Sequence, residues 1–410
     1  MKKKRDYLLL KILIGVGLGL LAGYLIKMTS GTPTESGGLS TQHVIMNFVL
    51  SIKHIFGQII FFMVPLIIIG FITPAIVRMK NNANKMLGTI LILAYSSSVL
   101  AAIMSMVAGY IIIPHLNIAR DMTSLTALPE MIFKLDIAPM FPVITSLFFA
   151  ITFGLAIVYT KSETLEKIFL EVHNVVMLLV NKVIIPILPF FIFTTFVQLT
   201  YSGLITDQLP VFVKMVILVL IGHIVWLTIL YAIGGLISKQ NPLKVIKYYA
   251  PAYFTAVGTM SSAATLPVAI KCANKSEVLN KEVANFTIPM GATIHLCGSV
   301  LTETFFVMGI SYLLTGALPS LTTMLIFVFL LGIFAIGAPG VPGGTVMASI
   351  GIIASVLGFD DTGIALVMAI FALQDSFGTA CNVTGDGALS LMLQGIFKKK
   401  PGDETPEANG

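Results

Sequence analysis

The chain has 410 residues, of which 56% are hydrophobic and only 11% are charged, whereas a soluble fold of this size carries roughly 25% charged residues. This composition excludes a water-soluble multidomain protein and indicates a polytopic protein of the lipid bilayer. The net charge of +6 predicts no nucleic-acid partner, because the basic residues lie in short runs beside apolar segments, as in membrane loops. The three cysteines, Cys272, Cys297 and Cys381, form no CxxC pair and predict neither a disulfide framework nor a zinc site.

Eight apolar segments are long enough to be transmembrane helices, since a bilayer core of about 30 Å needs about 20 helical residues. They lie near residues 8–26, 44–77, 86–114, 140–160, 168–200, 208–237, 278–313 and 361–396. The first segment follows the basic run 2–5 and is too long for the apolar part of a signal peptide, so we expect no cleavable leader.

Two further apolar segments, 244–270 and 320–358, are interrupted by Gly, Ser and Pro at 258–267 and 337–344. Their arms, of roughly ten to sixteen residues, are too short to cross a bilayer. We expect two re-entrant helical hairpins, the first entering from the cytoplasm and the second from outside. Such a pair indicates a transporter's midplane binding site. The alternative is a pair of ordinary kinked helices, because Gly and Pro are common in membrane spans.

Lysine and arginine are concentrated in alternate loops, which gives the orientation. They lie at 2–5, 78–85, 161–167, 239–281 and 398–400, whereas the loops 27–43, 201–207 and 314–319 carry almost none. The loop 115–139 is mixed in charge. By the positive-inside rule we expect a multi-pass protein of the cell membrane with both termini in the cytoplasm.

Four polar residues of the last span, Asp375, Thr379, Asn382 and Asp386, are spaced to share one helix face, within about 60° of one another. The two carboxylates lie roughly 16 Å apart along the axis, too far for a dyad that shares a proton. A charge at mid-bilayer costs at least about 2.5 kcal/mol and is usually functional. We expect two subsites, Asp375 for a cationic group such as an α-ammonium and Asp386 for Na⁺. The alternative is an ion pair with a lysine inside the bundle, for which the candidates are Lys53, Lys182 and Lys214.

The span 278–313 contains two glycines, a proline and several hydroxyls between Pro289 and Glu303. This composition predicts a helix unwound in mid-membrane, whose freed carbonyls can coordinate a cation. His295 in this stretch is either a packed, hydrogen-bonded residue or a ligand. Glu303 either forms a structural pair or carries a proton, its pKa then raised by desolvation.

These motifs resemble the dicarboxylate/amino acid:cation symporter family, the sodium-coupled glutamate and neutral amino-acid transporters. The resemblance covers nearly the whole chain and rests on the segments 260–267, 291–299, 340–343 and 375–386. It implies an all-α elevator fold of eight transmembrane helices plus two opposed re-entrant hairpins, assembled as a homotrimer.

The resemblance also implies a division of the chain. Residues 1–77 and 140–200 would form a scaffold, and residues 86–114 and 208–396 a transport domain that moves against it, with the second hairpin as the outer gate. Residues 397–410 would be a cytoplasmic tail.

The site residues that the resemblance implies fall into three sets. Asp375, Thr379 and the Val341 carbonyl would bind the substrate ammonium. Asn382 and Ser262 would bind its carboxylate. Ser299 and Gly378 complete this set. Two sodium ions would be bound, one by Asp386 and the carbonyls of Gly291, His295 and Asn382, the other by the carbonyls of Thr293, Ala335, Ile336 and Ala338. Glu303 matches the position of a proton-linked glutamate in animal members of the family.

Several positions depart from the acidic-substrate members of that family. Gly378 and Met260 stand where such members carry an arginine for the side-chain carboxylate, and a desolvated carboxylate without that partner is disfavoured. We therefore expect small neutral substrates such as serine, threonine or alanine, which residues 373–376 also favour by likeness to serine/threonine members. Acidic amino acids or dicarboxylates, and proton-coupled uptake, are the alternatives. Members of that family can bind a third sodium ion through a carboxylate at the position that is Cys297 here. Tyr95 and Ser98 could still face such a site. Because the carboxylate is missing, we expect fewer coupled sodium ions.

Two other classes of protein fit the sequence less well. A membrane-embedded enzyme needs a Ser–His pair, a close Asp dyad or a metal cluster, and no such spacing is found, so we expect no enzyme and no organic cofactor. A passive channel explains the polar face of the last span but leaves the two opposed hairpins without a role.

Overall fold

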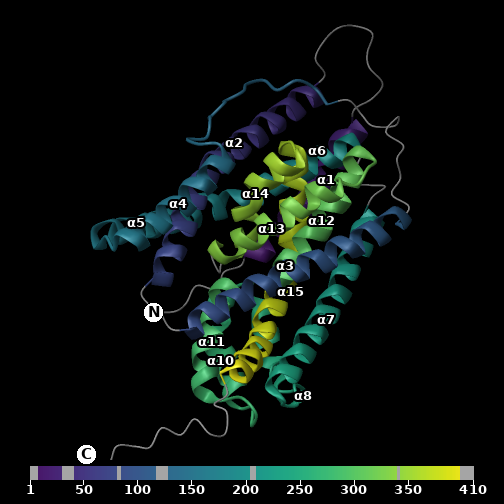
Figure 1. Ribbon diagram of the computed structural model, residues 1–410. Helices are drawn as coiled ribbons and strands as arrows, with labels where there is room; N and C mark the ends of the chain where they lie inside the picture. The colour runs from purple at the N-terminus through teal and green to yellow at the C-terminus, as the bar shows by residue number, and fades with distance from the viewer. Residues whose placement is uncertain are drawn as a thin grey trace, which may run out of the picture.

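The computed structural model describes residues 8–29, 41–80, 85–116, 128–203, 209–338 and 342–397, and every regular element in these ranges is helical (Figure 1). The predicted all-α fold class is confirmed. The first half forms α1 (Leu8–Thr29), α2 (Thr41–Lys80), α3 (Lys85–Ile112), η1 (Ile113–His115), α4 (Val143–Thr160), α5 (Glu163–Leu179), η3 (Val180–Ile184) and α6 (Ile185–Ser202). The second half forms α7 (Leu209–Ser238), α8 (Leu243–Ile246), α9 (Ala250–Thr259), α10 (Ser262–Asn274), α11 (Lys281–Ile294), α12 (Cys297–Thr315), α13 (Leu321–Gly337), α14 (Gly344–Leu357) and α15 (Asp361–Ile396).

Six helical runs in the described residues are long and apolar enough to cross a bilayer. They are Val44–Pro74, Lys85–His115, Glu163–Ser202, Pro210–Ser238, Lys281–Thr315 and Asp361–Ile396. The other two expected spans correspond to α1 and α4, which are shorter apolar helices over the parts Ile14–Thr29 and Phe148–Thr160. A protein of several membrane helices is therefore supported, and eight crossings stay a prediction.

The expected span 278–313 is two helices rather than one. α11 ends at Ile294 and α12 begins at Cys297, and the backbone of the two residues between them is non-helical (φ −115°, ψ 97° at His295; φ −117°, ψ 39° at Leu296). The Gly and Pro content predicts this interruption. The run Glu163–Ser202, in contrast, stays continuous through the π-helical turn η3, which joins α5 to α6.

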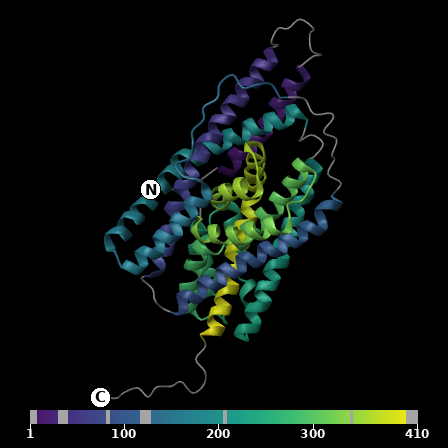
Figure 2. The same ribbon diagram turned by 45° about the horizontal axis from the view of Figure 1, so that its top comes forward.

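Both interrupted segments fold as helical hairpins rather than as single kinked helices. α9 and α10 pack against each other and are separated by Met260 and Ser261, whose hydroxyl caps α10 by accepting the Ala264 N–H at 3.2 Å. α13 and α14 likewise pack against each other. In Figures 1 and 2 the α9/α10 hairpin lies at the end of the molecule where α15 finishes, and α13 and α14 lie towards the other end. Their entry into a membrane from opposite faces stays a prediction.

The helices that carry the polar residues are the most enclosed. In the most apolar 18-residue stretch of each run, 94% of the residues are buried within Lys281–Thr315 and 89% within Asp361–Ile396, against 33% within Pro210–Ser238. α15 packs against α7, α9, α11 and α12, which surround it. The polar face of α15 is thus turned towards protein rather than towards the exposed apolar belt of the outer helices.

Glycines bring α1 into backbone contact with α6. A Cβ at Gly15, Gly19 or Gly23 would lie 2.8, 2.7 and 2.6 Å from a carbonyl oxygen of α6. This spacing of four residues is the small-residue stripe that lets membrane helices approach closely. The contact fixes the first helix to the α2, α4, α5 and α6 side of the molecule.

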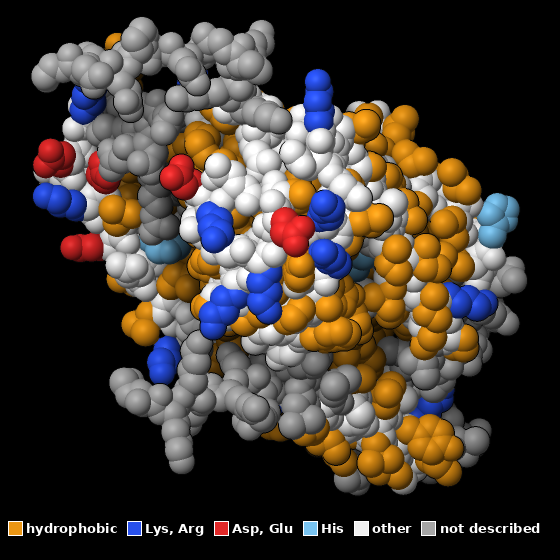
Figure 3. Space-filling view, turned by 90° about the horizontal axis from the view of Figure 1, so that it is seen from below, with side chains coloured by type: hydrophobic (Ala, Val, Ile, Leu, Met, Phe, Trp, Pro, Cys, Tyr) orange, Lys and Arg blue, Asp and Glu red, His pale blue; other side chains and the backbone are white. Residues whose placement is uncertain are grey.

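Lysine side chains gather at one end of the molecule. Figure 3 views that end and shows blue Lys and Arg side chains beside orange apolar surface. The exposed lysines of α8, α10 and the neighbouring helix ends are Lys239, Lys244, Lys247, Lys271, Lys275 and Lys281. The basic runs at 2–5 and 398–400 lie outside the described residues.

Candidate functional site

The Asp375 carboxylate lies on the buried face of α15, beneath the tip of the α13/α14 hairpin. Its Oδ2 accepts the N–H of Gly343 at 2.6 Å, and its Oδ1 accepts the hydroxyl of Thr379 one turn later at 3.5 Å. Gly343, the N-cap residue of α14, has a φ of +71°, a left-handed conformation that favours glycine. Asp375 is 4% exposed, so a carboxylate with neutral donors sits at the junction of the hairpin and α15.

The Asn382 amide binds the start of α12. Its Oδ1 accepts the backbone N–H groups of Gly298 (2.7 Å) and Ser299 (3.2 Å), and its Nδ2 donates to the Ser299 hydroxyl at 2.9 Å. These N–H groups lack intrahelical partners because they belong to the first turn of a helix. Asn382 therefore caps α12 from α15 and positions Ser299 beside the polar face.

The Asp386 carboxylate contacts the break between α11 and α12. His295 Nδ1 lies 3.0 Å from its Oδ1, and His295 Nε2 lies 2.8 Å from the hydroxyl of Ser97 on α3. Gly291 makes this approach possible, because a Cβ there would lie 3.0 Å from Asp386 Oδ2 and closer still to the rest of the carboxyl group. The three polar side chains form one buried chain from α3 to α15.

The second expected carbonyl set lies at the C-terminal ends of α11 and α13, two helices that contact each other. Thr293 is in the last turn of α11, and its hydroxyl donates to the Met290 carbonyl at 2.8 Å. The last turn of α13 contains Ala335 and Ile336, and Ala338 is its extended C-cap residue. The last carbonyls of a helix lack partners within the helix, which is the kind of oxygen a sodium ion binds, although the Ala335 carbonyl accepts the Ala338 N–H at 3.3 Å.

Glu303 is fully buried in α12. Its Oε1 accepts a hydrogen bond from the Ser349 hydroxyl of α14, and its Oε2 has no partner among the described residues. The side chain thus links α12 to the second arm of the α13/α14 hairpin, and half of its carboxyl group remains available for a proton.

The structure brings most of the expected site residues together, and leaves some apart. Asp375 and Thr379 share one contact region, whereas the Asn382 amide binds Ser299 and α12 rather than Ser262, the buried first residue of α10. Val341 lies outside the described residues. For the third sodium site, the Tyr95 hydroxyl donates to the Phe329 carbonyl at 3.4 Å, and the buried Ser98 hydroxyl has no partner among the described residues.

The alternative of an ion pair with a lysine is not seen at Asp375 or Asp386 among the described residues. Lys53 Nζ donates to Gln198 at 2.6 Å, and Lys182 and Lys214 are exposed. Asp386 instead contacts His295. The alternative of a structural pair therefore applies to Asp386, with a histidine as the partner instead of one of the candidate lysines.

Four partners of the site were missed in the sequence: Ser97, Gly298, Gly343 and Ser349. A Ser–His contact that no spacing along the chain indicated is also present, because Ser97 and His295 are hydrogen-bonded although they are 198 positions apart. Spacing along the chain cannot reveal such a pair. A polar run in an otherwise apolar span, here 96–98, is the signal that could have drawn attention to it.

Comparison with known proteins agrees with these features. A sequence model described as the sodium:dicarboxylate symporter family matches residues 8–396. The chain is 29% identical to the neutral amino acid transporter B(0) of Homo sapiens over 252 residues, 60% of this chain and 46% of that protein. It is 30% identical to the excitatory amino acid transporter 1 of Homo sapiens over 244 residues, 58% of this chain and 44% of that protein. The aligned part is less than half the length of either relative. The match of the family model over residues 8–396 confirms the resemblance seen in the motifs.

Proposed function

Because the chain belongs to the sodium:dicarboxylate symporter family, we propose that it is a secondary active transporter that couples sodium to the uptake of an amino acid. We further propose that its substrates are small neutral amino acids such as serine, threonine or alanine. The site is proposed to contain Asp375 and Thr379 for the substrate ammonium, and Asn382 and Ser262 for its carboxylate.

The observation that carries this proposal is the environment of Asp375. Its carboxylate is buried and accepts hydrogen bonds from Gly343 and Thr379, and no Lys, Arg or His side chain lies within 4.0 Å of it among the described residues. A buried carboxylate that lacks a cation is costly unless one is supplied. The α-ammonium of an amino acid supplies it, and the two neutral donors leave lone pairs of the carboxylate free.

A neutral rather than an acidic substrate is supported by the surroundings of Gly378. A Cβ at this position would already lie 3.4 Å from Ser299 Cα and 3.5 Å from its hydroxyl oxygen. The glycine therefore faces the start of α12 closely, and the three nearest atoms to this Cβ position all belong to Ser299, so none is from a cationic side chain that could balance a second substrate carboxylate. Acidic amino acids remain the second candidate, because a relative of similar identity is named an excitatory amino acid transporter.

Sodium is proposed as the coupling ion at two places. One is Asp386 with the carbonyls of Gly291, His295 and Asn382, and the other is the set of carbonyls at the C-terminal ends of α11 and α13. Both consist of oxygen ligands, which suit a hard cation.

The proposed movement is the one that membership of the family implies. We propose that α1, α2, α4, α5 and α6 form the scaffold of a trimer, and that α3 and α7 to α15 form the transport domain, with the α13/α14 hairpin as outer gate. The exposed lysines around α8 and α10 support a cytoplasmic position for that end. We assign no catalytic role to the Ser97–His295–Asp386 chain, because its side chains are enclosed by packed helices.

A ligand screen by thermal unfolding tests the proposal. Bound ligand stabilises the folded protein by RT ln(1 + [L]/Kd), about 2.7 kcal/mol at a hundred times Kd. We expect serine to raise the melting temperature in sodium chloride and not in choline chloride, and Asp375→Ala to lose this shift. An equal shift with aspartate, or a serine shift that is independent of sodium, would contradict the substrate or the coupling ion.

Counterflow in proteoliposomes separates a carrier from a channel. Unlabelled serine inside the vesicles should accelerate uptake of labelled serine from outside, because a carrier exchanges its load across the membrane. Uptake that ignores the internal serine would indicate a passive pathway instead.

A further inference from the structure

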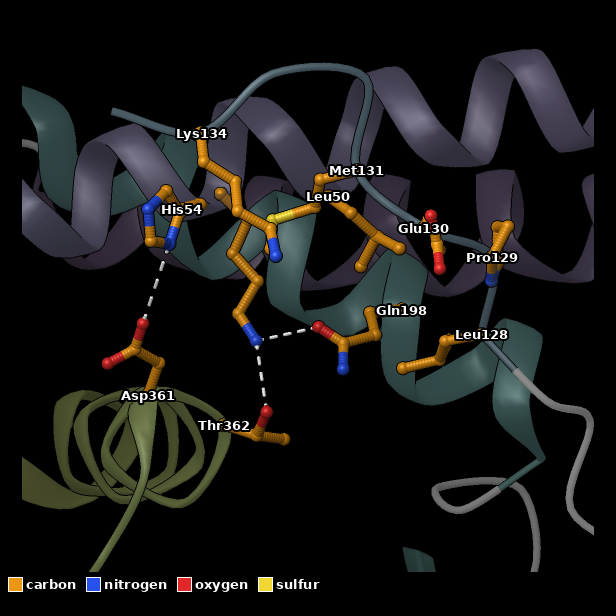
Figure 4. Close-up of a pocket in the computed structure, with 11 residues that line it drawn as sticks. Leu50, His54, Leu128, Pro129, Glu130, Met131, Lys134, Gln198, Asp361 and Thr362 are labelled. Atoms are coloured by element: carbon orange, nitrogen blue, oxygen red, sulfur yellow. Dashed lines mark hydrogen bonds and ion pairs between the residues drawn. The ribbon is translucent and has the colours of Figure 1, made fainter. Parts of the chain in front are cut away.

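A cavity of about 380 Å³ lies apart from the polar face of α15 (Figure 4). It is bounded by α2, by α6, by residues 128–134 and by the first turn of α15. None of its lining residues belongs to the Asp375, Asp386 or Glu303 contacts described above. Its volume falls within the range of small-molecule sites, about 300–1,000 Å³.

A buried lysine forms the floor of this cavity. Lys53 is 6% exposed, and among the described residues it is the one Lys or Arg side chain that is buried. Its Nζ donates to Gln198 Oε1 at 2.6 Å and makes a longer contact of 3.4 Å with the Thr362 hydroxyl. An ammonium has three N–H donors, so one donor is left for a ligand in the cavity.

Both partners of Lys53 are neutral. No carboxylate of the described residues lies within 4.0 Å of its Nζ. The two nearby aspartates flank another side chain, since His54 lies 3.3 Å from Asp136 and 3.8 Å from Asp361. Asp361, which lines the cavity, and its neighbour Asp360 act on the Lys53 charge at longer range. A buried charge without an opposite charge in contact is costly, and no carboxylate of the described residues contacts the Lys53 ammonium directly.

The rim of the cavity adds a second cation. Lys134 comes from the segment after Leu128, and Figure 4 shows its side chain reaching towards the cavity from the side opposite Thr362. Glu130, four residues before Lys134, also lines the cavity, so the rim carries a carboxylate as well as this lysine. A carboxylate between Lys53 and Lys134 would receive charge-assisted hydrogen bonds from both, which are roughly twice as strong as neutral ones.

We propose that this cavity is a second binding site, for a small carboxylate-bearing solute, with Lys53 as the group that binds the carboxylate. The Gln198 and Thr362 side chains orient the ammonium, and Lys134 closes the site from the rim. Because α2 and α6 form one wall and the first turn of α15 the other, an occupied site bridges these helices. The inference stands independently of the transport proposal, since it shares no residue with the proposed substrate and sodium sites.

The test measures binding of lactate by isothermal titration calorimetry to the full-length protein carrying Asp375→Ala, which removes the proposed substrate site. Sodium lactate is compared with sodium chloride at equal sodium, and with propane-1,2-diol, which has lactate's carbon skeleton without the carboxylate. We expect saturable binding of lactate alone. Equal heats for chloride would overturn the carboxylate assignment, and no binding of lactate would overturn the site.

Two variants locate the site. Gln198→Glu places a carboxylate within hydrogen-bonding distance of Lys53 and supplies the missing counter-ion from the protein, so lactate should bind about tenfold more weakly or not at all. Lys53→Arg keeps the charge and should keep binding, whereas Lys85→Met removes an exposed lysine of α3 outside the cavity and should change nothing. Lactate binding that survives Gln198→Glu unchanged would contradict the proposal, even if a neutral substitution of Lys53 failed to fold.

Discussion

His295 and Asp386 bind each other in the interior of the protein: the imidazole Nδ1 lies 3.0 Å from the carboxylate Oδ1, and both side chains are almost completely enclosed. The contact joins the break between α11 and α12 to α15. It also places an imidazole against the carboxylate that we propose as a sodium ligand. The ring and the ion would therefore compete for the same oxygen.

The first prediction concerns stability. His295→Ala and Asp386→Ala should each lower the stability of the protein by about 3 kcal/mol or more, because each leaves one polar partner buried alone. The double variant should lose less than the sum of the two, and thermal unfolding of all four proteins gives this coupling. Ser97→Ala, which removes only the hydrogen bond to Nε2, should cost about 1 kcal/mol. Additive losses would show that the pair is not coupled.

The second prediction concerns sodium. In His295→Ala the Asp386 carboxylate has lost its partner, so sodium chloride should raise the melting temperature of this variant more than that of the unchanged protein, both measured against choline chloride. Asp386→Ala should lose this additional response. The same sodium response in both proteins would mean that the ion does not bind at Asp386.

The third prediction concerns the cap of α12. Asn382→Ala leaves the N–H groups of Gly298 and Ser299 without an acceptor, which should cost about 1–3 kcal/mol for each group that stays dry. Asn382→Asp keeps an acceptor, and a negative charge is favoured at a helix N-terminus, so it should unfold closer to the unchanged protein. Thermal unfolding compares the two variants, and equal losses would show that the cap contributes little.

Much of the fold is predictable because hydropathy is summed over long windows. The last span, expected at 361–396, is α15 from Asp361 to Ile396, and the capping contact of the Asp360 carboxylate with the Gly363 N–H (2.8 Å) fixes its start. The same summation conceals short features. The two-residue break at His295 and the π-helical turn at Val180–Ile184 change the path of the chain without changing its mean hydropathy.

The site is predictable only within one element. The spacing of Asp375, Thr379 and Asn382 indicates a shared face because a helix has a fixed period. Their partners come from other helices, and no period along the chain relates Ser97 to His295 or Gly343 to Asp375. Such contacts depend on which helices pack together, and the periodicity of one helix carries no information about its neighbours.

The fourth prediction separates sodium coupling from proton coupling. Glu303→Gln removes the ionisable group and keeps a side chain that can bond to Ser349, so it should fold and retain sodium-driven uptake of serine. Ser349→Ala removes the partner of Glu303 and should cost about 1–3 kcal/mol of stability. Uptake into proteoliposomes, driven first by a sodium gradient and then by a pH gradient, is the measurement. Loss of uptake in Glu303→Gln without loss of stability would favour proton coupling.

The fifth prediction concerns the hairpin tip above Asp375. The 2.6 Å hydrogen bond from Gly343 to the carboxylate is charge-assisted, and it ties the start of α14 to α15. Asp375→Ala should therefore speed amide hydrogen exchange in a peptide covering residues 342–350. Asp375→Asn, which keeps a weaker acceptor, should have an intermediate effect. A peptide covering α9 is the control and should exchange at an unchanged rate. In the unchanged protein, serine with sodium should slow exchange at the tip, because the bound substrate adds contacts beneath it. Tip exchange that does not respond to either substitution would mean that packing of α14 alone holds the hairpin closed.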